Sequence, residues 1–470
     1  MEYKLPDLNL ARKRSKAQVT RRNYNLPDNL KNLGKNKTYL IKTHGCTANE
    51  RDSETIAGIL ENMGFKKSIN EEKANLIFIN TCAIRSGAEN KVWGELGALN
   101  RYKYENPDMI IGVCGCMAQE ESTIKDILSK YPQVDLIFGT HNIDDLPNLL
   151  NKAIRRKTIE VESIEGEVIE NLPSVRVSDY KAQVNIMYGC DKFCAYCIVP
   201  YTRGKERSRF IEDVLAEVKE LKEKGYKEVS LLGQNVNAYG KDLNLGYDFA
   251  TLLEEVAKIG IPRIRFLTSH PWDFNDEMIA VMKKYPNIMP YLHLPLQSGS
   301  TNVLKKMNRR YTEDSYKKLF DKIKANLPHY AITTDIIVAF PTETEEDFKK
   351  TLDMVDYCKY DNAFTFIFSP REGTPAYSMV NTIPEEEKKR RLQVLNEKVA
   401  YWANLNARKY DNRIVEVLCD GPSKKNKEIL SGYTPEFKIV NFKGTAKAGD
   451  LVKVKINEAL SFSLNGEQID

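Results

Sequence analysis

Several signals that would assign a chain to a common class are missing from this sequence of 470 residues. No apolar run approaches the length that spans a bilayer, and the first 37 residues contain no apolar stretch suited to a secretion signal. The five histidines show no paired spacing typical of a metal site, and nothing resembles a Ser-His-Asp triad or a phosphate-binding loop. We therefore expect a cytoplasmic protein without membrane contact, and neither a triad hydrolase nor a phosphate-loop NTPase.

Excess charge is also missing from most of the chain. The net charge is +5, yet residues 1–37 alone contain ten lysines and arginines against Glu2, Asp7 and Asp28, so the remainder is close to neutral. A basic segment with few aliphatic residues is typical of a mobile arm. We expect residues 1–37 to form such an arm, which either stays solvated or contacts a phosphate backbone.

Residues 38–150 alternate short apolar runs with amphipathic stretches. The apolar runs predict strands at 38–43, 75–81, 109–113 and 136–139, and the stretches between them predict helices at 50–63, 86–103 and 118–130. This order predicts an α/β domain with an open parallel sheet. Cys46, Cys82 and Cys116 each follow the carboxyl end of a predicted strand, which is where open α/β sheets bind ligands. Three cysteines that are far apart in the sequence are therefore expected to meet.

The alternation resumes at a larger scale after residues 151–178, an acidic and irregular segment that we interpret as a linker. Residues 179–408 contain six strand-and-helix units, which predict a partial (β/α)6 barrel with its site at the carboxyl ends of the strands. The strands are expected at 182–187, 228–232, 263–267, 291–295, 334–339 and 363–368. A long polar helix, roughly 385–409, is expected to follow.

The last segment, residues 409–470, changes character, because its alternating apolar and polar residues are punctuated by glycine turns. It predicts a small β-barrel with Lys424, Lys425 and Lys427 on its surface. Small barrels of this kind often bind single-stranded or looped nucleic acid. A barrel that only stabilises the chain or joins subunits is the alternative.

Nine cysteines in a reducing compartment do not indicate disulfides, and their positions indicate metal. Cys190, Cys194 and Cys197 form a C-x3-C-x2-C motif directly after the first predicted barrel strand. Thiolates at these intervals on one loop can hold three irons of a [4Fe–4S] cube and leave the fourth iron open to substrate. A structural zinc site is the alternative, but it needs a fourth ligand, and the nearest histidines are the distant His141 and His270.

Longer motifs carry a resemblance to a known family. They are residues 43–46 (THGC), 80–82 (NTC), 115–119 (GCMAQ), 198–204 (IVPYTRG), 232–235 (LGQN) and 294–300 (LPLQSGS). From about residue 38 onward the chain resembles the radical S-adenosylmethionine (SAM) methylthiotransferases. Three further motifs resemble the MiaB branch, which modifies dimethylallyladenosine in tRNA: residues 306–312 (KMNRRYT), 364–375 (FTFIFSPREGTP) and 421–426 (GPSKKN). The C-terminal barrel resembles the TRAM domain, an RNA-binding module.

One motif departs from the pattern of the branch. Cys46 follows His44-Gly45 and precedes Thr47-Ala48, where the branch usually has Tyr-Gly before the cysteine and Gln-Met after it. The cysteine itself is kept, so the departure concerns the surroundings of the expected ligand.

The resemblance implies an enzyme that places a methylthio group on carbon 2 of N(6)-isopentenyladenosine at position 37 of tRNA. It implies that the three cysteines of the loop motif hold the radical SAM [4Fe–4S] cluster. Cys46, Cys82 and Cys116, which we call the strand-end cysteines, would hold an auxiliary [4Fe–4S] cluster that delivers sulfur. Two SAM molecules would be used per turnover, one as the source of the 5′-deoxyadenosyl radical and one as the methyl donor.

The resemblance also implies contacts with SAM. Gln234 and Asn235 follow the second barrel strand, where related enzymes hold the methionine part of the cofactor, and Gln297 and Ser298 follow the fourth. Ordinary polar loop residues are the alternative for all four. Near the cysteine loop, three arginines are expected to grip the tRNA backbone or a cofactor carboxylate, with structural salt bridges as the alternative: Arg203, Arg207 and Arg209.

The family motif selects Cys116 over its neighbour Cys114. We therefore expect Cys114, and likewise Cys358 and Cys419, to be small buried hydrophobes rather than ligands.

Three other functions compete. Two are those of sister enzymes, which methylthiolate threonylcarbamoyladenosine in tRNA or an aspartate of a ribosomal protein; the second group usually lacks the Gln-Ser-Gly pattern at 297–299. The third is a non-catalytic iron–sulfur RNA-binding protein, which the intact three-cysteine motif disfavours. The expected partners are the anticodon stem-loop of tRNA, an external electron donor and a source of sulfur or of iron–sulfur clusters, and we expect a monomer.

Overall fold

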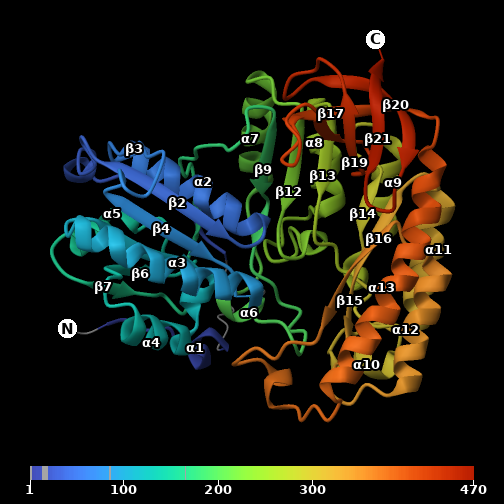
Figure 1. Ribbon diagram of the computed structural model, residues 1–470, viewed down its shortest axis with the longest axis horizontal. Helices are drawn as coiled ribbons and strands as arrows, with labels where there is room; N and C mark the ends of the chain where they lie inside the picture. The colour runs from blue at the N-terminus through green and yellow to red at the C-terminus, as the bar shows by residue number, and fades with distance from the viewer. Residues whose placement is uncertain (1–2, 13–18, 84–85, 165, 470) are drawn as a thin grey trace. The chain divides into compact units, whose positions relative to one another are not determined.

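The computed structural model describes residues 3–12, 19–83, 86–164 and 166–469. The chain divides into two compact units (Figure 1). The first comprises Met1–Val177, Met187–Asp191 and Ile198–Arg209, and the second comprises Ser178–Ile186, Lys192–Cys197 and Phe210–Asp470. Each unit is built around parallel strands of its own.

The first unit contains a six-stranded, entirely parallel sheet with the order β3-β2-β4-β5-β6-β7. Its strands are β2 (Thr38–His44), β3 (Lys66–Lys67), β4 (Leu76–Thr81), β5 (Ile110–Gly115), β6 (Leu136–Phe138) and β7 (Thr158–Glu160). Its helices are α2 (Thr47–Asn62), α3 (Ser86–Glu105), α4 (Glu121–Lys130) and α5 (Leu146–Ala153). A short 3₁₀ turn, η2 (Cys116–Gln119), precedes α4, and α6 (Val199–Thr202) and the strand pair β10 (Met187–Tyr188) and β11 (Arg207–Ser208) also belong to this unit.

Both faces of this sheet are covered by helices. Ile77 and Ile79 of β4 join the apolar core beneath α3 and α4, whereas Phe78 joins the core beneath α2 and α5. All six residues of β4 are buried, as a central strand of a parallel sheet requires. The predicted open parallel α/β sheet is therefore confirmed.

The interpretation of residues 151–178 as a linker is wrong. β7 pairs in parallel with β6 and completes the sheet, and β8 (Val168–Glu170) pairs in parallel with β1 (Arg21–Asn23). Strands of three residues are too short to give a periodic apolar pattern, so the sequence of this segment does not reveal them.

The expected mobile arm is also wrong for the part of residues 1–37 that the structure describes. β1 is paired, Lys4 forms a parallel bridge with Glu160, and Leu30 is only 2% exposed. Tyr24, Leu26 and Leu33 pack against the core beneath α2 and α5, so a few apolar side chains fix the segment. Three basic residues of the expected arm lie outside the described residues: Lys13, Arg14 and Lys16.

The second unit contains two three-stranded parallel sheets with the orders β13-β12-β9 and β14-β15-β16. The strands are β9 (Lys181–Asn185), β12 (Glu228–Leu232), β13 (Arg263–Phe266), β14 (Tyr291–His293), β15 (Ala331–Val338) and β16 (Asn362–Ile367). A parallel bridge between Ile264 and Ile288 connects β13 to the segment before β14. The six strands follow one another as in an incomplete barrel, which confirms the prediction.

Helices alternate with these strands. They are α7 (Ile211–Glu223), α8 (Phe249–Ile259), α9 (Asp276–Lys284), α10 (Thr301–Lys306), α11 (Glu313–Asn326), α12 (Glu345–Cys358) and the long α13 (Glu385–Ala407). The expected helix at 385–409 corresponds to α13 and the 3₁₀ turn that follows it, η6 (Arg408–Tyr410).

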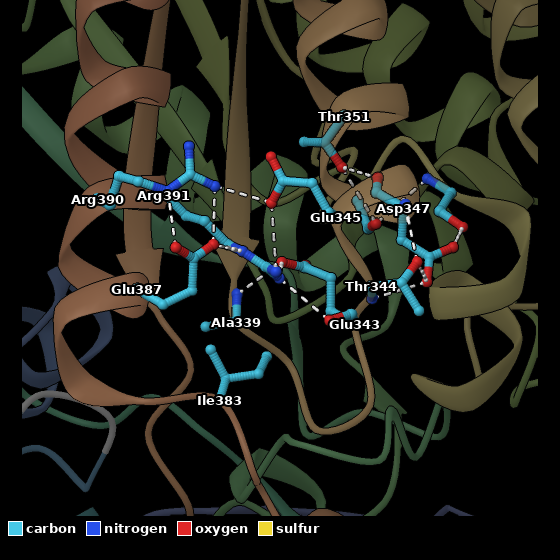
Figure 2. A network of polar contacts seen from close by, with 12 residues as sticks. Ala339, Glu343, Thr344, Glu345, Asp347, Thr351, Ile383, Glu387, Arg390 and Arg391 are labelled. Carbon is cyan, nitrogen blue, oxygen red and sulfur yellow. Dashed lines mark hydrogen bonds and ion pairs between the residues drawn. The ribbon is translucent and has the colours of Figure 1, made fainter.

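A polar network ties α13 to the loop between β15 and α12 (Figure 2). The guanidinium of Arg391 is buried and bonds to Glu343 (Nη1–Oε1 2.8 Å) and to Glu387 (Nε–Oε1 2.7 Å). Glu343 in turn accepts the backbone N–H of Ala339, directly after β15 (3.0 Å). Buried cations with two carboxylate partners fix a geometry strongly, so the carboxyl end of β15 is held in place.

The same network reaches the loop after β14. Asp347, in the first turn of α12, accepts the hydroxyl of Ser300 (2.6 Å), and Thr351 accepts the backbone N–H of Gly299 (3.0 Å). A Cβ at Gly299 would lie 2.4 Å from the carbonyl oxygen of Lys350, so the close approach of this loop to α12 requires glycine.

The chain ends in a closed barrel with the order β17-β18-β19-β21-β20, drawn in red in Figure 1. Its strands are β17 (Ile414–Pro422), β18 (Leu430–Tyr433), β19 (Ile439–Lys443), β20 (Leu451–Ala459) and β21 (Leu464–Ile469). Val417, Val440, Phe442, Val454 and Ile456 fill its interior. The small C-terminal β-barrel is confirmed. Among the described residues, no helix combines the length and the apolarity that a bilayer span requires.

Candidate functional site

Three cysteines lie at the carboxyl edge of the six-stranded sheet. Cys46 follows β2 and begins α2, Cys82 follows β4, and Cys116 follows β5. The amide of Asn49 donates to Asn80 Oδ1 (3.1 Å) and to Thr81 O (3.0 Å), which fastens the first turn of α2 to the end of β4. The convergence expected from the strand pattern is therefore observed.

The electrostatics of this edge favour a thiolate at one position. A hydrogen bond with the Cys82 thiol is the main cause that lowers the pKa of Cys46 to about 5, and Arg203 acts in the same direction against burial. Burial raises the pKa of Cys116, and the charge of Arg203, together with a hydrogen bond from it, opposes this. Arg203 is itself buried and paired with Asp52 of α2 (Nη2–Oδ2 2.7 Å).

The two other arginines of the cysteine segment also have structural partners. Arg209 forms a bidentate buried pair with Glu170 (2.8 and 2.6 Å), and Arg207 donates to the carbonyl of Gly166 (3.0 Å). For Arg203 and Arg209 the structure therefore contains the salt bridges that were the alternative to cofactor or tRNA contacts.

The remaining cysteines behave as expected of buried hydrophobes. Cys114 has no exposed surface, joins the core beneath α2 and α5, and has a pKa raised well above its usual value by burial. Cys358 on α12 and Cys419 on β17 are also buried. All nine cysteines lie within the described residues, and none of them forms a disulfide.

The strand-end thiols do not form a site for a single metal ion, because within the described residues no three His, Cys, Asp or Glu side chains are grouped closely enough to bind one. A cube of four irons is larger than one ion, so its thiolate ligands lie farther apart. At the end of the neighbouring β6, both ring nitrogens of His141 are buried without a hydrogen-bond partner in this part of the structure. The donor set and these orphaned nitrogens fit a polar group at the sheet edge.

The C-x3-C-x2-C loop begins in the first unit with Cys190 and continues in the second with Cys194 and Cys197. Cys194 is buried, and the backbone N–H of Cys197 donates to its carbonyl (2.9 Å). The backbone of Ala195 is held on both sides, by Met307 O (2.9 Å) and by the N–H of Ala376 (2.8 Å). The second half of the loop is thus fixed to the second unit.

A buried carboxylate anchors the loop a second time. Asp273, in the 3₁₀ turn η4 (Pro271–Asp273) after β13, binds Lys192 of the loop (2.7 Å), Asn235 after β12 (2.8 Å) and Lys241 (2.7 Å). Burial alone would raise the pKa of Asp273, but the hydrogen bonds from Lys192, Lys241 and Asn235 outweigh it and lower the pKa to about 2.

The four residues expected to contact SAM lie at the carboxyl ends of strands in the second unit. Gln234 Oε1 is buried without a hydrogen-bond partner in the described structure, whereas Asn235 binds Asp273. Gln297 has a left-handed backbone (φ 67°) and pairs with Ile336 of β15. Ser298 is fully buried, accepts the backbone N–H of Ser300 (3.2 Å), and its hydroxyl lies 3.4 Å from that of Thr351 on α12, so its contacts position the loop against α12.

Two further polar atoms, which the sequence did not single out, share the unsatisfied, buried state of Gln234 Oε1. Ser269 Oγ and His270 Nε2 follow β13, are buried, and have no hydrogen-bond partner in the described structure. Unpaired buried polar atoms carry a desolvation cost unless a ligand satisfies them. Their position at the strand ends therefore fits a polar cofactor.

Two aromatic rings are exposed on one face of the sheet β14-β15-β16. Thr365 of β16 bonds to Asn396 of α13 (2.5 Å), so α13 covers the face of Thr365, and Phe364 and Phe366 point to the opposite side. These two rings are 49% and 46% exposed. His293 lies on the same side, within 3.2 Å of Asp335 and with its ring 5.9 Å from that of Phe364. Barrel interiors are normally filled, so exposed aromatic rings here leave room for a flat apolar ligand.

Comparison with known proteins covers all three parts of the chain. The uncharacterized protein family UPF0004 matches residues 38–139, the radical SAM superfamily matches residues 184–355, and the TRAM domain matches residues 408–469. The tRNA-2-methylthio-N(6)-dimethylallyladenosine synthase of Staphylococcus epidermidis is 53% identical over 99% of this chain and 91% of its own length. The synthase of the same name from Bacillus cytotoxicus is 54% identical over 100% and 93%. This chain belongs to the tRNA-2-methylthio-N(6)-dimethylallyladenosine synthase family.

Solved structures share the fold of this chain at low sequence identity. The radical SAM methyltransferase TsrM from Kitasatospora setae, with tryptophan and a SAM analogue bound, has a TM-score of 0.53 and 14% identity. It covers 73% of this chain and 75% of its own. The cobalamin-dependent SAM radical enzyme OxsB has a TM-score of 0.51 and 14% identity, covering 77% and 61%.

Several residues that contact or position the cysteines could not be found from sequence patterns. Asp52 and Asp273 are single acids on a helix or in a loop and carry no motif signal. Arg309 was quoted only as part of the 306–312 motif, yet its Nη1 lies 3.2 Å from Cys194 Sγ. The one signal in the sequence was that Arg309 belongs to a motif to which no role had been assigned.

Proposed function

We propose that this chain transfers a methylthio group to carbon 2 of N(6)-dimethylallyladenosine at position 37 of tRNA. The observation that carries the proposal is the convergence of Cys46, Cys82 and Cys116 at one sheet edge, in a family member that also carries the C-x3-C-x2-C motif. A chain that needed only one cluster would have no reason to gather a second set of three thiols.

The two sets of cysteines take different roles in this proposal. Cys190, Cys194 and Cys197 hold the [4Fe–4S] cluster that binds SAM, and the strand-end cysteines hold a second [4Fe–4S] cluster. When bound, these groups and two SAM molecules supply the electron, the adenosyl radical, the sulfur and the methyl group. The lowered pKa of Cys46 supports this role, because only a thiolate ligates iron.

The polypeptide orients the reactants. Gln234, Ser269 and His270 offer unsatisfied polar atoms to SAM, and Gln297 remains a candidate contact. Asn235 and Ser298 act as positioning residues, because Asn235 holds Asp273 and Ser298 contacts both its own loop and Thr351 of α12.

The adenine ring would lie on the inner face of β14–β16. Phe364 and Phe366 offer an apolar surface for the ring and its dimethylallyl group, and the His293–Asp335 pair offers hydrogen bonds to the ring nitrogens. Holding the ring between these side chains excludes water from the carbon that reacts.

The C-terminal barrel would bind the tRNA backbone through Lys424, Lys425 and Lys427. All three are exposed on the turn between β17 and β18, and Lys425 lines a hollow of about 430 Å³ whose other lining residues include Asn426, Lys443 and the acids Glu458 and Glu467. Exposed lysines next to amide side chains suit phosphate and ribose groups.

The remaining requirements follow from the chemistry. An external electron donor must reduce the loop cluster, and a source of sulfur or of iron–sulfur clusters must resupply the auxiliary one. We place the enzyme in the cytoplasm with its tRNA and expect it to act as a monomer.

Mass spectrometry of tRNA nucleosides tests the proposal. A strain that lacks the gene should lose 2-methylthio-N(6)-dimethylallyladenosine and accumulate the unmethylthiolated nucleoside, and only the wild-type chain, not Cys82→Ala, should restore it. Loss of the methylthio form of threonylcarbamoyladenosine, or of a methylthiolated ribosomal aspartate, would instead identify a sister activity.

A further inference from the structure

Arg309 carries a buried positive charge beside a cysteine of the loop motif. Its side chain is 5% exposed and follows α10 in the second unit. Nη1 donates to Cys194 Sγ (3.2 Å), Nε donates to the hydroxyl of Tyr311 (3.0 Å), and Nη2 donates to Pro295 O (3.3 Å). Each guanidinium nitrogen thus has a partner, and none of the three partners is a carboxylate.

Most of the other buried arginines pair with a carboxylate. Arg203 pairs with Asp52, Arg209 with Glu170, Arg265 with Glu228 and Arg391 with Glu343. Across the described residues, no Asp or Glu side chain forms an ion pair with Arg309. Burying a guanidinium without an anion is strongly unfavourable, so the fold implies an anion at this position that is not a carboxylate.

The sulfur that Arg309 contacts identifies that anion. Tyr311 and the carbonyl of Pro295 are dipolar partners, whereas Cys194 becomes an anion as a thiolate. A [4Fe–4S] cluster with three thiolate ligands also has a net negative charge, which grows by one when the cluster accepts an electron. The guanidinium therefore lies where both the ligand and the cluster need a counter-charge.

The backbone around Arg309 is built for this contact. Asn308 (φ 58°) and Arg310 (φ 56°) both adopt the left-handed conformation, which L-residues seldom take twice within three positions. The amide of Asn308 also donates to the carbonyl of Phe193 (2.9 Å), so the same segment fixes both the backbone and the sulfur of the cysteine loop.

We propose that Arg309 is the counter-ion of the cluster held by Cys194: it donates an N–H···S hydrogen bond to the thiolate and raises the reduction potential of the cluster. The inference rests on the proposed function, because it assumes that Cys194 is a cluster ligand. In the step concerned, one electron passes from the external donor to the cluster, no bond forms or breaks, and Arg309 keeps its proton and charge. Hydrogen bonds to cluster sulfurs are a known means of setting cluster potentials.

A redox titration of the full-length chain tests this. Cys46→Ala, Cys82→Ala and Cys116→Ala together leave only the cluster of the loop motif, and titanium(III) citrate reduces it while electron paramagnetic resonance reports the reduced fraction. Arg309→Met should make reduction at least tenfold less favourable, which is a shift of about 59 mV to lower potential for a one-electron couple. Arg309→Lys retains the charge and should stay close to the parent chain.

Arg310→Met is the matched control. It removes the same charge at the next position, but the side chain of Arg310 is exposed, so solvent screens it and the potential should not change. Equal potentials in Arg309→Met and the parent chain, at equal iron content, would overturn the inference.

Iron content resolves the remaining outcomes. If Arg309→Met and Arg309→Gln lose the cluster while Arg309→Lys keeps it, the counter-ion role is supported, because charge alone distinguishes the variants. Loss of the cluster from Arg309→Lys as well would mean that packing holds the loop, and the inference would fail. Absence of any cluster from the parent chain would instead refute the proposed function.

Discussion

Replacement of Asp273 by Asn should weaken SAM binding without slowing the chemistry. The carboxylate is 2% exposed and receives Lys192, Lys241 and Asn235 at 2.7–2.8 Å, so little of its interaction is screened. The shift of its pKa from 3.8 to about 2 corresponds to about 2 kcal/mol that the native contacts contribute at neutral pH. If all of this energy holds the cysteine loop in the form that binds SAM, its loss raises the apparent Kd by up to about 30-fold.

The sign of the pH dependence follows from the same shift. Because the pKa of Asp273 is lower in the folded chain, its contribution is fully present above about pH 4 and is lost only as the pH falls towards 2. The difference between wild type and Asp273→Asn should therefore be constant from about pH 6 to pH 8.

Anaerobic calorimetric titration with SAM measures this prediction, together with kcat at saturating SAM. Lys241→Met is the matched control: it removes a second partner of the same carboxylate, but the side chain of Lys241 is 53% exposed, so its pair is worth at most about 1 kcal/mol, or about fivefold in Kd. A Kd within twofold of wild type in Asp273→Asn, or an equal effect of Lys241→Met, would refute the reasoning.

Three further predictions test the sites separately. Anaerobic reconstitution should load about eight irons, and Cys46→Ala should reduce this to about four, whereas Cys114→Ala should keep both clusters; an unchanged iron content in Cys46→Ala would exclude the auxiliary cluster. Phe364→Ala should raise KM for a dimethylallylated anticodon stem-loop by about 5- to 150-fold through lost stacking worth about 1–3 kcal/mol, and Thr365→Ala, on the face covered by α13, should not; equal KM values in the two variants would contradict a base on the inner face. Replacing Lys424, Lys425 and Lys427 together by Ala should flatten the salt dependence of tRNA binding by up to about three units of log–log slope and leave SAM cleavage without tRNA unchanged, whereas an unchanged slope would move the phosphate contacts elsewhere.

The parts of the fold that could be predicted are those that local patterns encode. Runs such as Leu76–Thr81 are apolar at nearly every position because a central parallel strand is buried on both faces, and their ends located Cys46, Cys82 and Cys116. The cysteine loop was recognisable because its three thiols lie within eight residues of sequence, Cys190 to Cys197. In both cases residues that meet in the structure could be recognised from their spacing along the chain.

Contacts between distant residues were not predictable in this way. Arg203 and Asp52 are 151 residues apart, and Arg309 and Cys194 are 115 apart, so their meeting depends on strand order and on loop conformation. Short elements were missed for a related reason. Thr158–Glu160 has too few residues to show an apolar period. It pairs with β6, which would otherwise be an open edge of the sheet.

The two arginines that lie against cysteine sulfurs differ in what balances them. Arg203 is 2.7 Å from Asp52, so this carboxylate offsets part of the charge through which Arg203 lowers the pKa of Cys116. Arg309 has no such carboxylate within the described residues, so its whole charge acts on Cys194 in a medium of low dielectric constant, where a charge is felt several times more strongly than in water. In the proposed mechanism the strand-end site holds sulfur, whereas the loop site must accept an electron, and only the second process adds negative charge. An unbalanced cation is therefore useful beside Cys194, whereas beside Cys116 the charge of the same residue type is partly offset by Asp52.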